Sequence, residues 1–131
     1  MILLDTHVWL WFVSNPELLS NKARKAVDSA ILKEKIFISS ISAWEVALLV
    51  YNQRLRLTLD VADWIAKSEM LPYFQFIPVD NAIAIKSVNL PKPLHSDPAD
   101  RIIIATAISL GASLLTKDEK ILNYPHVKTV W

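Results

Sequence analysis

The first five residues constrain the fold more strongly than any other part of the sequence. Three apolar residues, Ile2, Leu3 and Leu4, run directly into Asp5. A short apolar run that ends at a polar residue predicts a strand buried on both faces, which is typical of parallel sheets. Asp5 is then expected at the carboxyl end of this strand. Because ligands of open α/β sheets bind at that edge, the residues that join Asp5 there are expected to decide the function.

Strand-like and helix-like segments alternate along the rest of the chain. Further strands are expected at 36–39, 74–78 and 112–116, and 128–130 adds an edge strand if the sheet has five. Helices are expected at 6–13, 21–34, 40–52, 61–71, 81–88 and 98–110, the last ended by Gly111. The alternation predicts a three-layer α/β/α sandwich with a parallel, Rossmannoid sheet of four to five strands. The length predicts a single domain over residues 1–131.

Composition excludes several classes of chemistry. The chain has no cysteine, which excludes disulfides, zinc thiolate sites and thiol catalysis, and its single glycine excludes a glycine-rich phosphate loop. The net charge of +1 does not by itself indicate a nucleic-acid partner. No apolar run has the length of a membrane span, and no signal peptide precedes the first strand. A cytoplasmic protein without a membrane partner is therefore expected.

Acidic residues follow or open several of the expected elements. Asp5 follows the first strand, Glu45 lies one turn into the helix after the second, and Asp118 closely follows the fourth. All three are expected at the carboxyl edge of the sheet. Asp97 and Asp100 open the long helix before the fourth strand. The edge at which this pair lies is left open, because a helix after a long loop can start at either end.

Each acid also has a local explanation as a helix cap. Ser42 and Glu45 have the spacing of a capping box. The segment 97–100 has an acid at the N-cap, proline at the first helical position and an acid at the third, which is a favourable helix start. Asp5 and Asp118 can cap the helices that follow them. Taken singly, each acid is explained by capping.

Taken together, the acids are harder to explain by capping alone. Two unit charges about 4 Å apart interact by about 4 kcal/mol at an effective dielectric of 20, so close carboxylates must separate, take up protons or share a cation. Oxygen ligands suit a hard divalent cation. Without cysteine or a His-x-x-x-His pair, the pattern indicates Mg²⁺ or Mn²⁺ rather than zinc. One or two such ions activate water and stabilise charge during phosphodiester hydrolysis.

Four motifs carry a resemblance to a known family. They are Leu3-Leu4-Asp5-Thr6-His7, Ser42-Ala43-Trp44-Glu45, Asp97-Pro98-Ala99-Asp100-Arg101 continued by Ile104-Ala105-Thr106-Ala107, and Leu115-Thr116-Lys117-Asp118. In this order and spacing, over nearly the whole chain, the sequence resembles PIN domains. Among these it is most similar to the VapC-like toxin nucleases of bacterial and archaeal toxin–antitoxin pairs. The resemblance implies a PIN-like α/β/α fold and a magnesium-dependent endoribonuclease that leaves a 3′-hydroxyl and a 5′-phosphate.

The resemblance also implies roles for individual residues. The acids expected to act in catalysis and to hold Mg²⁺ or Mn²⁺ are Asp5, Glu45, Asp100 and Asp118, with Asp97 as an accessory metal ligand. Thr6 and Thr116 are expected to support the site through their hydroxyls. The family implies a homodimer and a small antitoxin protein that occludes the site. Two residues depart from the family pattern: Ala99 replaces a common aromatic, and Gln53 a common glycine. They leave local packing and partner fit open.

Other side chains have competing explanations. The candidates for contacts with the RNA backbone are Arg54, Arg56, Arg101, Lys117 and Lys120. The alternative for these is an ordinary solvated charge, or structural pairing in the case of Arg101. His7 and His95 can meet substrate or serve packing and capping. Trp9 and Trp11 lie two residues apart, so a helix cannot bury both on one face, and one is expected to meet a second subunit, the antitoxin or a neighbouring helix.

Two functions of other classes remain as alternatives. The first is a PIN-like module with a silent site that binds RNA or protein; a missing acid would favour it, and none is missing. The second is a phosphoacceptor receiver domain, which is also α/β with an acidic edge and a lysine, here Lys117, after a late strand. A receiver needs paired acids after its first strand and a lone acid after its third. Here Asp5 stands alone, and Asp80 is a weak match for the second requirement.

Overall fold

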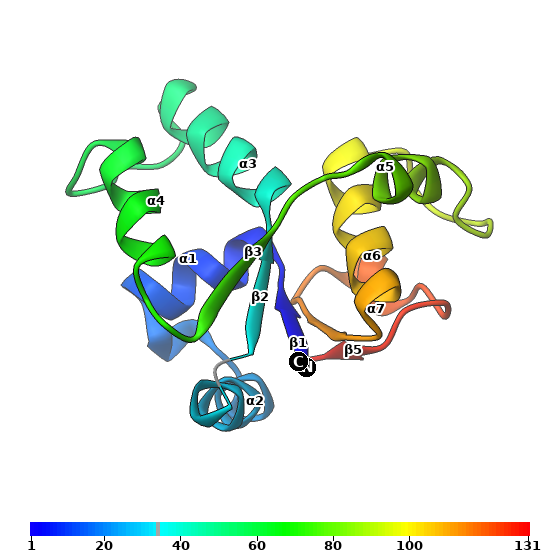
Figure 1. Ribbon diagram of the computed structural model, residues 1–131, viewed down its shortest axis with the longest axis horizontal. Helices are drawn as coiled ribbons and strands as arrows, with labels where there is room; N and C mark the ends of the chain where they lie inside the picture. Colours follow the sequence, from blue (N-terminus) through cyan, green and yellow to red (C-terminus); the bar gives the residue numbers. More distant parts are fainter. Residues whose placement is uncertain (34) are drawn as a thin grey trace.

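A parallel sheet with β1 at its centre organises the molecule. The computed structural model describes residues 1–33 and 35–131. Within these residues five strands form one sheet in the order β3-β2-β1-β4-β5, with every neighbouring pair parallel (Figure 1). Their bounds are β1 Ile2–Leu4, β2 Ile36–Ser39, β3 Phe74–Ile77, β4 Ser113–Leu115 and β5 Thr129–Val130. The expected α/β sandwich and its edge strand are confirmed.

Helices cover both faces of the sheet. Their bounds are α1 Thr6–Ser14, α2 Asn21–Leu32, α3 Ser40–Tyr51, α4 Val61–Glu69, α5 Asn81–Val88, α6 Pro98–Leu110 and α7 Glu119–Leu122, with a 3₁₀ turn η1 at Pro16–Leu18. The predicted ends agree within two residues, which is the usual uncertainty of a helix end. Glu34, the predicted last residue of α2, lies outside the described residues. Gly111 ends α6 with a left-handed φ of 65°, as expected.

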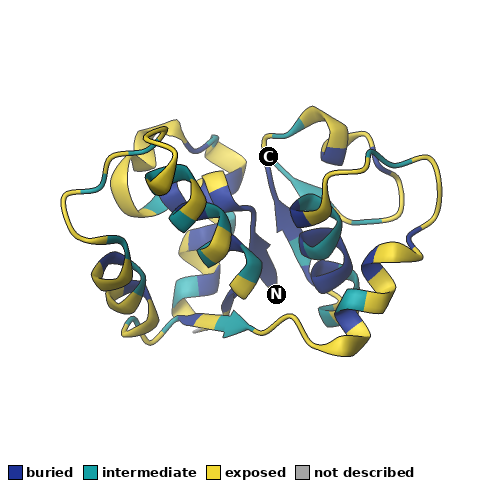
Figure 2. Cartoon of the chain, turned by 90° about the horizontal axis from the view of Figure 1, so that it is seen from above, coloured by how far each residue is buried: buried dark blue, intermediate teal, exposed yellow. Residues whose placement is uncertain are grey.

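The sequence of β1 explains why it is central. Leu4 packs on one face of the sheet, in a cluster that includes Trp9 of α1 and Val46 of α3. Leu3 packs on the other face with Ile103 of α6. Both leucines are fully buried. Figure 2 shows central strands of the sheet in the dark blue of buried residues. An apolar run without alternation therefore occupies a strand that needs apolar side chains on both faces.

The two tryptophans of α1 have different environments, as their spacing predicted. Trp9 is fully buried, its ring centroid lies 4.9 Å from that of Trp64 on α4, and its indole Nε1 donates to Ser68 Oγ at 3.2 Å. Trp11 is only partly buried, and its ring centroid lies 5.8 Å from that of Trp131. In the described part of the chain, no helix is both long and apolar enough to cross a membrane.

Candidate functional site

The expected acids line one cavity. It has a volume of about 480 Å³. Its lining residues are Asp5, His7, Trp11, Glu45, Asp97, Asp100, Lys117 and Asp118. The structure thus decides the question that the sequence left open, because the pair at the start of α6 lies at the same cavity as Asp5. Five carboxylates from four segments of the chain meet there.

Asp5 is held by hydrogen bonds to both of its oxygens. The backbone N–H of Thr6 donates to Oδ1 at 2.8 Å, which makes Asp5 the N-cap of α1. The hydroxyl of Thr116 donates to Oδ2 at 2.7 Å. Thr116 directly follows β4, the neighbour of β1, so the parallel register places the two side chains together. The same hydroxyl accepts a bond from the Asp118 N–H at 3.0 Å and so links the two acids.

Glu45 is held by Thr6 from the neighbouring helix. The Thr6 hydroxyl donates to Glu45 Oε1 at 2.6 Å and lies 2.8 Å from the hydroxyl of Ser42. A hydroxyl has one proton, so donation to Glu45 leaves Ser42 as the donor to Thr6. The capping-box alternative for Ser42 and Glu45 is therefore wrong. Ser39 caps α3 instead, by accepting from the Ile41 N–H, and this places Ser42 inside the helix.

The start of α6 holds the remaining pair of acids. Asp97 caps the helix by accepting from the Asp100 N–H at 2.9 Å. The Asp100 side chain instead pairs with His95, whose Nε2 lies 2.8 Å from Asp100 Oδ2. Asp118 likewise caps α7 by accepting from the Lys120 N–H. Capping and a place in the cavity are thus compatible for Asp5, Asp97 and Asp118.

Burial and mutual repulsion make the central acids weaker acids than usual. Burial raises the pKa of Asp5 above its ordinary value, and the bonds from Thr116 and Thr6 only partly oppose this effect. Burial also raises the pKa of Glu45 and of Asp100, and the charge of Asp5 adds to both shifts. The site therefore carries electrostatic strain that a cation would relieve.

Some of the basic residues that were candidates for RNA contact line the cavity or a hollow beside it, and others do not. Lys117 lines the cavity, with its Nζ 5.8 Å from the ring centroid of Trp11. Arg54 and Arg56 line an adjoining hollow. The guanidinium of Arg101 instead donates to three backbone carbonyls, so the structural alternative holds for it. Lys120 is exposed and lies outside both linings.

Comparison with known proteins identifies the family. The sequence profile of the PIN domain matches residues 2–127. The chain belongs to the PIN-domain family. It is 33% identical to ribonuclease VapC22 of Mycobacterium tuberculosis, over 99% of this chain and 98% of the relative. The resemblance seen in the sequence is confirmed.

Solved structures show the same PIN-domain fold. A toxin–antitoxin complex from Klebsiella pneumoniae matches with a TM-score of 0.66 and 23% identity, covering 100% of this chain and 97% of the other. VapBC2 from Rickettsia felis, bound to a DNA fragment from its promoter, matches with a TM-score of 0.72 and 18% identity, covering 100% and 99%. The receiver alternative is wrong, because the strand order differs from the 2-1-3-4-5 order of such domains. Asp80 moreover caps α5 and does not line the acidic cavity.

The donor atoms of this PIN-domain cavity fit a hard divalent cation. They are carboxylate oxygens supported by hydroxyls, and thiolates are absent from the whole sequence. Among the described residues, no three acidic or histidine side chains already converge as a complete ligand cluster. Mg²⁺ usually keeps several waters and binds through one or two carboxylates together with substrate phosphates, so the carboxylates that line this cavity would be sufficient to hold it.

Sequence reasoning missed two contacts at the cavity. It named His7 and His95 without partners, whereas His7 lines the cavity beside Asp5 and His95 pairs with Asp100. For Trp11 the sequence predicted only a contact with another helix or a protein partner, although the residue forms part of the cavity wall. The position of His7 and Trp11 on the helix that Asp5 caps was the available signal.

Proposed function

We propose that this PIN-domain protein is a Mg²⁺- or Mn²⁺-dependent endoribonuclease and the toxin of a toxin–antitoxin pair. The observation that carries the proposal is the meeting of five carboxylates at one cavity. The name of the relative VapC22, a ribonuclease, supports RNA as the substrate, and the toxin–antitoxin complexes with the same fold support an antitoxin partner. A place of action in the cytoplasm belongs to the same proposal.

The acids would share the binding of the metal. Asp5 and Asp100 are the main ligands, and Glu45, Asp118 and the accessory Asp97 complete the site. When bound, the metal supplies Lewis-acid stabilisation of the phosphate and lowers the pKa of the attacking water. Thr6 and Thr116 hold Glu45 and Asp5 in place through the hydroxyl bonds already described. Carboxylates held in a fixed orientation around the phosphate lower the barrier to reaction, because their positions need not be found again at each turnover.

Glu45 and Asp118 are suited to orient the attacking water. Glu45 Oε1 accepts from Thr6, whereas its Oε2 has no hydrogen-bond partner among residues 1–33 and 35–131. Its raised pKa brings this carboxylate closer to the range in which a group accepts a proton efficiently near neutral pH. Attack of water on the phosphodiester then leaves a 3′-hydroxyl and a 5′-phosphate.

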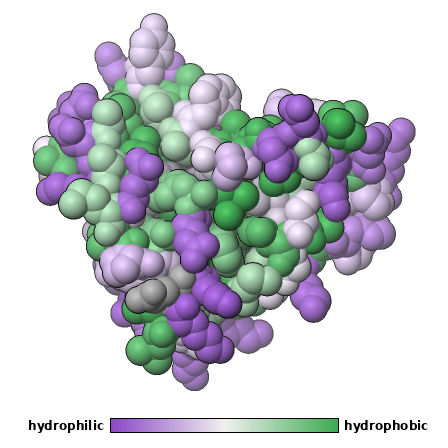
Figure 3. Space-filling model, in the orientation of Figure 1, coloured by the Kyte–Doolittle hydropathy of each residue, from purple (hydrophilic) through white to green (hydrophobic). Residues whose placement is uncertain are grey.

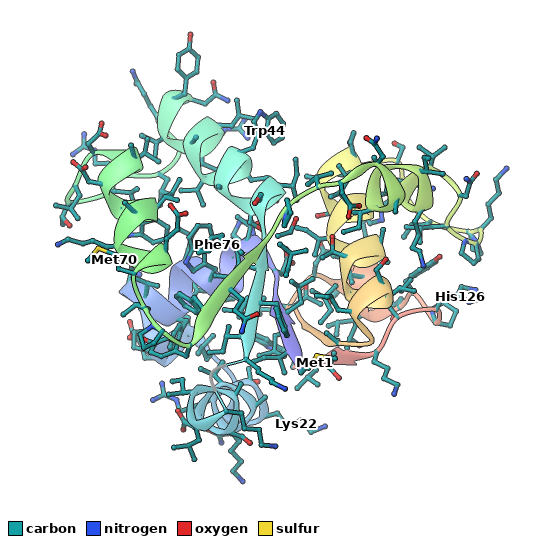
Figure 4. All side chains as sticks on the ribbon, viewed as in Figure 1. Met1, Lys22, Trp44, Met70, Phe76 and His126 are labelled. Carbon is teal, nitrogen blue, oxygen red and sulfur yellow. The ribbon has the colours of Figure 1, made fainter. Side chains whose placement is uncertain are left out.

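Exposed apolar residues are evidence that the protein binds protein partners. We propose that these partners are an antitoxin and a second copy of this chain. Trp44, Leu48 and Tyr51 recur at helical spacing on one face of α3 and are 54%, 40% and 83% exposed. Figure 4 shows Trp44 projecting from α3, away from α4. Apolar side chains also reach the surface elsewhere on the face shown in Figure 3. Light scattering of the purified protein, alone and with antitoxin, tests both partners.

A metal titration of RNA cleavage tests the proposal. The protein is stripped of metal and partner, and wild type is compared with Asp100→Asn, which keeps the shape of the side chain. We expect cleavage that requires Mg²⁺ or Mn²⁺ and falls at least ~100-fold in the variant, because a ligand of the reacting centre is lost. Equal cleavage by both proteins would reveal a contaminating nuclease. Metal binding without cleavage of a broad RNA panel would move the assignment to the silent binding module.

A further inference from the structure

A second hollow adjoins the acidic cavity. Its volume is about 230 Å³. His7 and Trp11 line both spaces, so α1 forms a shared wall between them. The far side of the second hollow is formed by the segment Arg54-Leu55-Arg56-Leu57. A chain-like ligand can therefore pass from the carboxylates across Trp11 to the two arginines.

The second hollow has fixed walls because its segment is anchored. Leu55 and Leu57 are half-buried and pack against the core cluster on the α1 side of the sheet. The alternating residues Arg54 and Arg56 are exposed. Because the leucines fix the backbone, the arginines are presented outward from a fixed position rather than from a flexible loop.

These two arginines are not used to hold the fold together. Arg24 donates to Pro16 O, and Arg101 donates to three carbonyls at the end of α5 and in the following loop. Within residues 1–33 and 35–131, the side chains of Arg54 and Arg56 make neither a hydrogen bond nor an ion pair. The chain thus keeps two cations without a structural partner beside its acidic site.

The positive charges beside the acidic cavity indicate that the second hollow binds a negatively charged chain. The five carboxylates of the acidic cavity repel a polyanion, so a nucleic-acid strand that reaches them needs cations along its path. Lys117 beside Trp11 and the pair Arg54 and Arg56 provide these cations on one side. The partly buried ring of Trp11 adds an aromatic surface between them. Cations that follow a backbone, interleaved with an aromatic ring, are the features that bind single-stranded nucleic acid.

We propose that the second hollow is a subsite for the RNA strand that flanks the scissile phosphate. Arg54 and Arg56 bind backbone phosphates on one side of the cleaved bond, and Trp11 with His7 offers aromatic surface to the intervening base. This subsite rests on the proposed ribonuclease function, since RNA is taken as its ligand. It sets affinity and the required substrate length, and it takes no part in the chemical step.

The test compares two double variants that each remove two positive charges. Arg54→Gln with Arg56→Gln removes both positively charged side chains from the subsite. Lys22→Gln with Lys25→Gln is the matched control, because both lysines are exposed on α2, which Figure 4 shows at the opposite end of the molecule from α3. Binding of a fluorescein-labelled, mixed-sequence single-stranded RNA of roughly twelve nucleotides is followed by anisotropy across a range of salt concentrations. Circular dichroism confirms that each variant folds.

The arginine variant is expected to bind RNA roughly 10-fold or more weakly than wild type. The slope of log K against log salt concentration should fall in magnitude by about 1.4, because two phosphate contacts to a single strand are lost. The lysine control should leave both values near those of wild type. An unchanged slope in the arginine variant, or an equal loss in both variants, overturns the subsite. In that case the two arginines would instead contact a protein partner or be ordinary solvated charges on the surface.

Cleavage measurements separate this subsite from the proposed function. With the long RNA the arginine variant should raise KM and leave kcat unchanged. A dinucleotide, whose single phosphate is the scissile one, should be cleaved equally well by variant and wild type, because it has no second phosphate to place in the adjoining hollow. A length-independent effect contradicts the subsite while leaving the nuclease intact. RNA binding that depends on the arginines, without any cleavage by wild type, contradicts the nuclease while leaving the subsite intact.

Discussion

His95 Nε2 lies 2.8 Å from Asp100 Oδ2, and this pair joins the loop between α5 and α6 to the acidic cavity. The bond fixes one oxygen of Asp100, while Oδ1 has no hydrogen-bond partner in the described part of the chain. Arg101, the next residue, donates to the carbonyl of His95 at 3.2 Å and to two carbonyls at the end of α5. The guanidinium thus holds the loop that carries the histidine, and the histidine holds the acid.

Replacement of His95 by alanine should weaken Mn²⁺ binding and RNA cleavage by roughly 10- to 100-fold, the usual effect of removing a group that orients a metal ligand. Calorimetric titration with Mn²⁺ measures the affinity without requiring activity. His95→Gln keeps a side-chain donor and should restore part of the affinity. His126→Ala is the control, because this exposed histidine does not line the cavity. Figure 4 shows it near the edge of the molecule. Mn²⁺ affinity equal to wild type in His95→Ala would show that the pair has no positioning role.

Replacement of Thr116 by valine should lower the free energy of unfolding by about 1–3 kcal/mol. Valine keeps the shape of this fully buried side chain but removes the hydroxyl that donates to Asp5 and accepts from the Asp118 N–H. Urea denaturation gives the change. Thr129→Val on the edge strand β5 controls for the substitution itself. If both variants lose equal stability, the hydroxyl of Thr116 has no special importance.

The metal-free protein should lose stability relative to Asp100→Asn as the pH rises. Because the pKa of Asp100 is raised in the folded state, the folded protein binds more protons than the unfolded chain between the ordinary value of 3.8 and the raised one. Stability from this group is therefore present below its unfolded pKa and is lost as the pH rises through its folded pKa. The difference in melting temperature between the variant and wild type should grow over this interval, and Mg²⁺ should reduce it. A constant difference across the interval would contradict the raised pKa.

Replacement of Gln53 by glycine should stabilise the protein by up to about 1 kcal/mol. Gln53 has a φ of 60°, in the left-handed region that costs a residue with a Cβ about 1–2 kcal/mol. Glycine removes this cost but adds about 0.5–1 kcal/mol of backbone entropy, so the net gain is small. This conformation also fits the glycine that the resemblance to PIN domains led us to expect at this position. Thermal denaturation measures the effect, and Gln53→Ala, which keeps a Cβ, should not reproduce it.

The order of the elements was predictable because burial leaves a direct trace in the sequence. The apolar runs at β1 and β2 and the helical spacing of apolar residues in α6 reflect contacts with the core. The short η1 was missed, because three residues after a proline give no periodic signal. Cap residues explain the accurate helix starts, since Asp60, Asp80 and Asp97 each accept a bond from the first turn.

The sequence by itself determined that Asp5, Glu45 and Asp118 collect at one edge of a parallel sheet, because strand direction and helix starts are local properties. The tertiary structure added Asp97 and Asp100 to this edge. Only the tertiary structure decided which atoms hold each acid. Thr116 reaches Asp5 across 111 positions of the chain, and Thr6 reaches Glu45 across 39. No local pattern encodes such pairs, since they depend on the strand order that places β4 beside β1 and on the packing of α3 against α1. For the same reason Ser42 proved to be a partner of Thr6 rather than a helix cap.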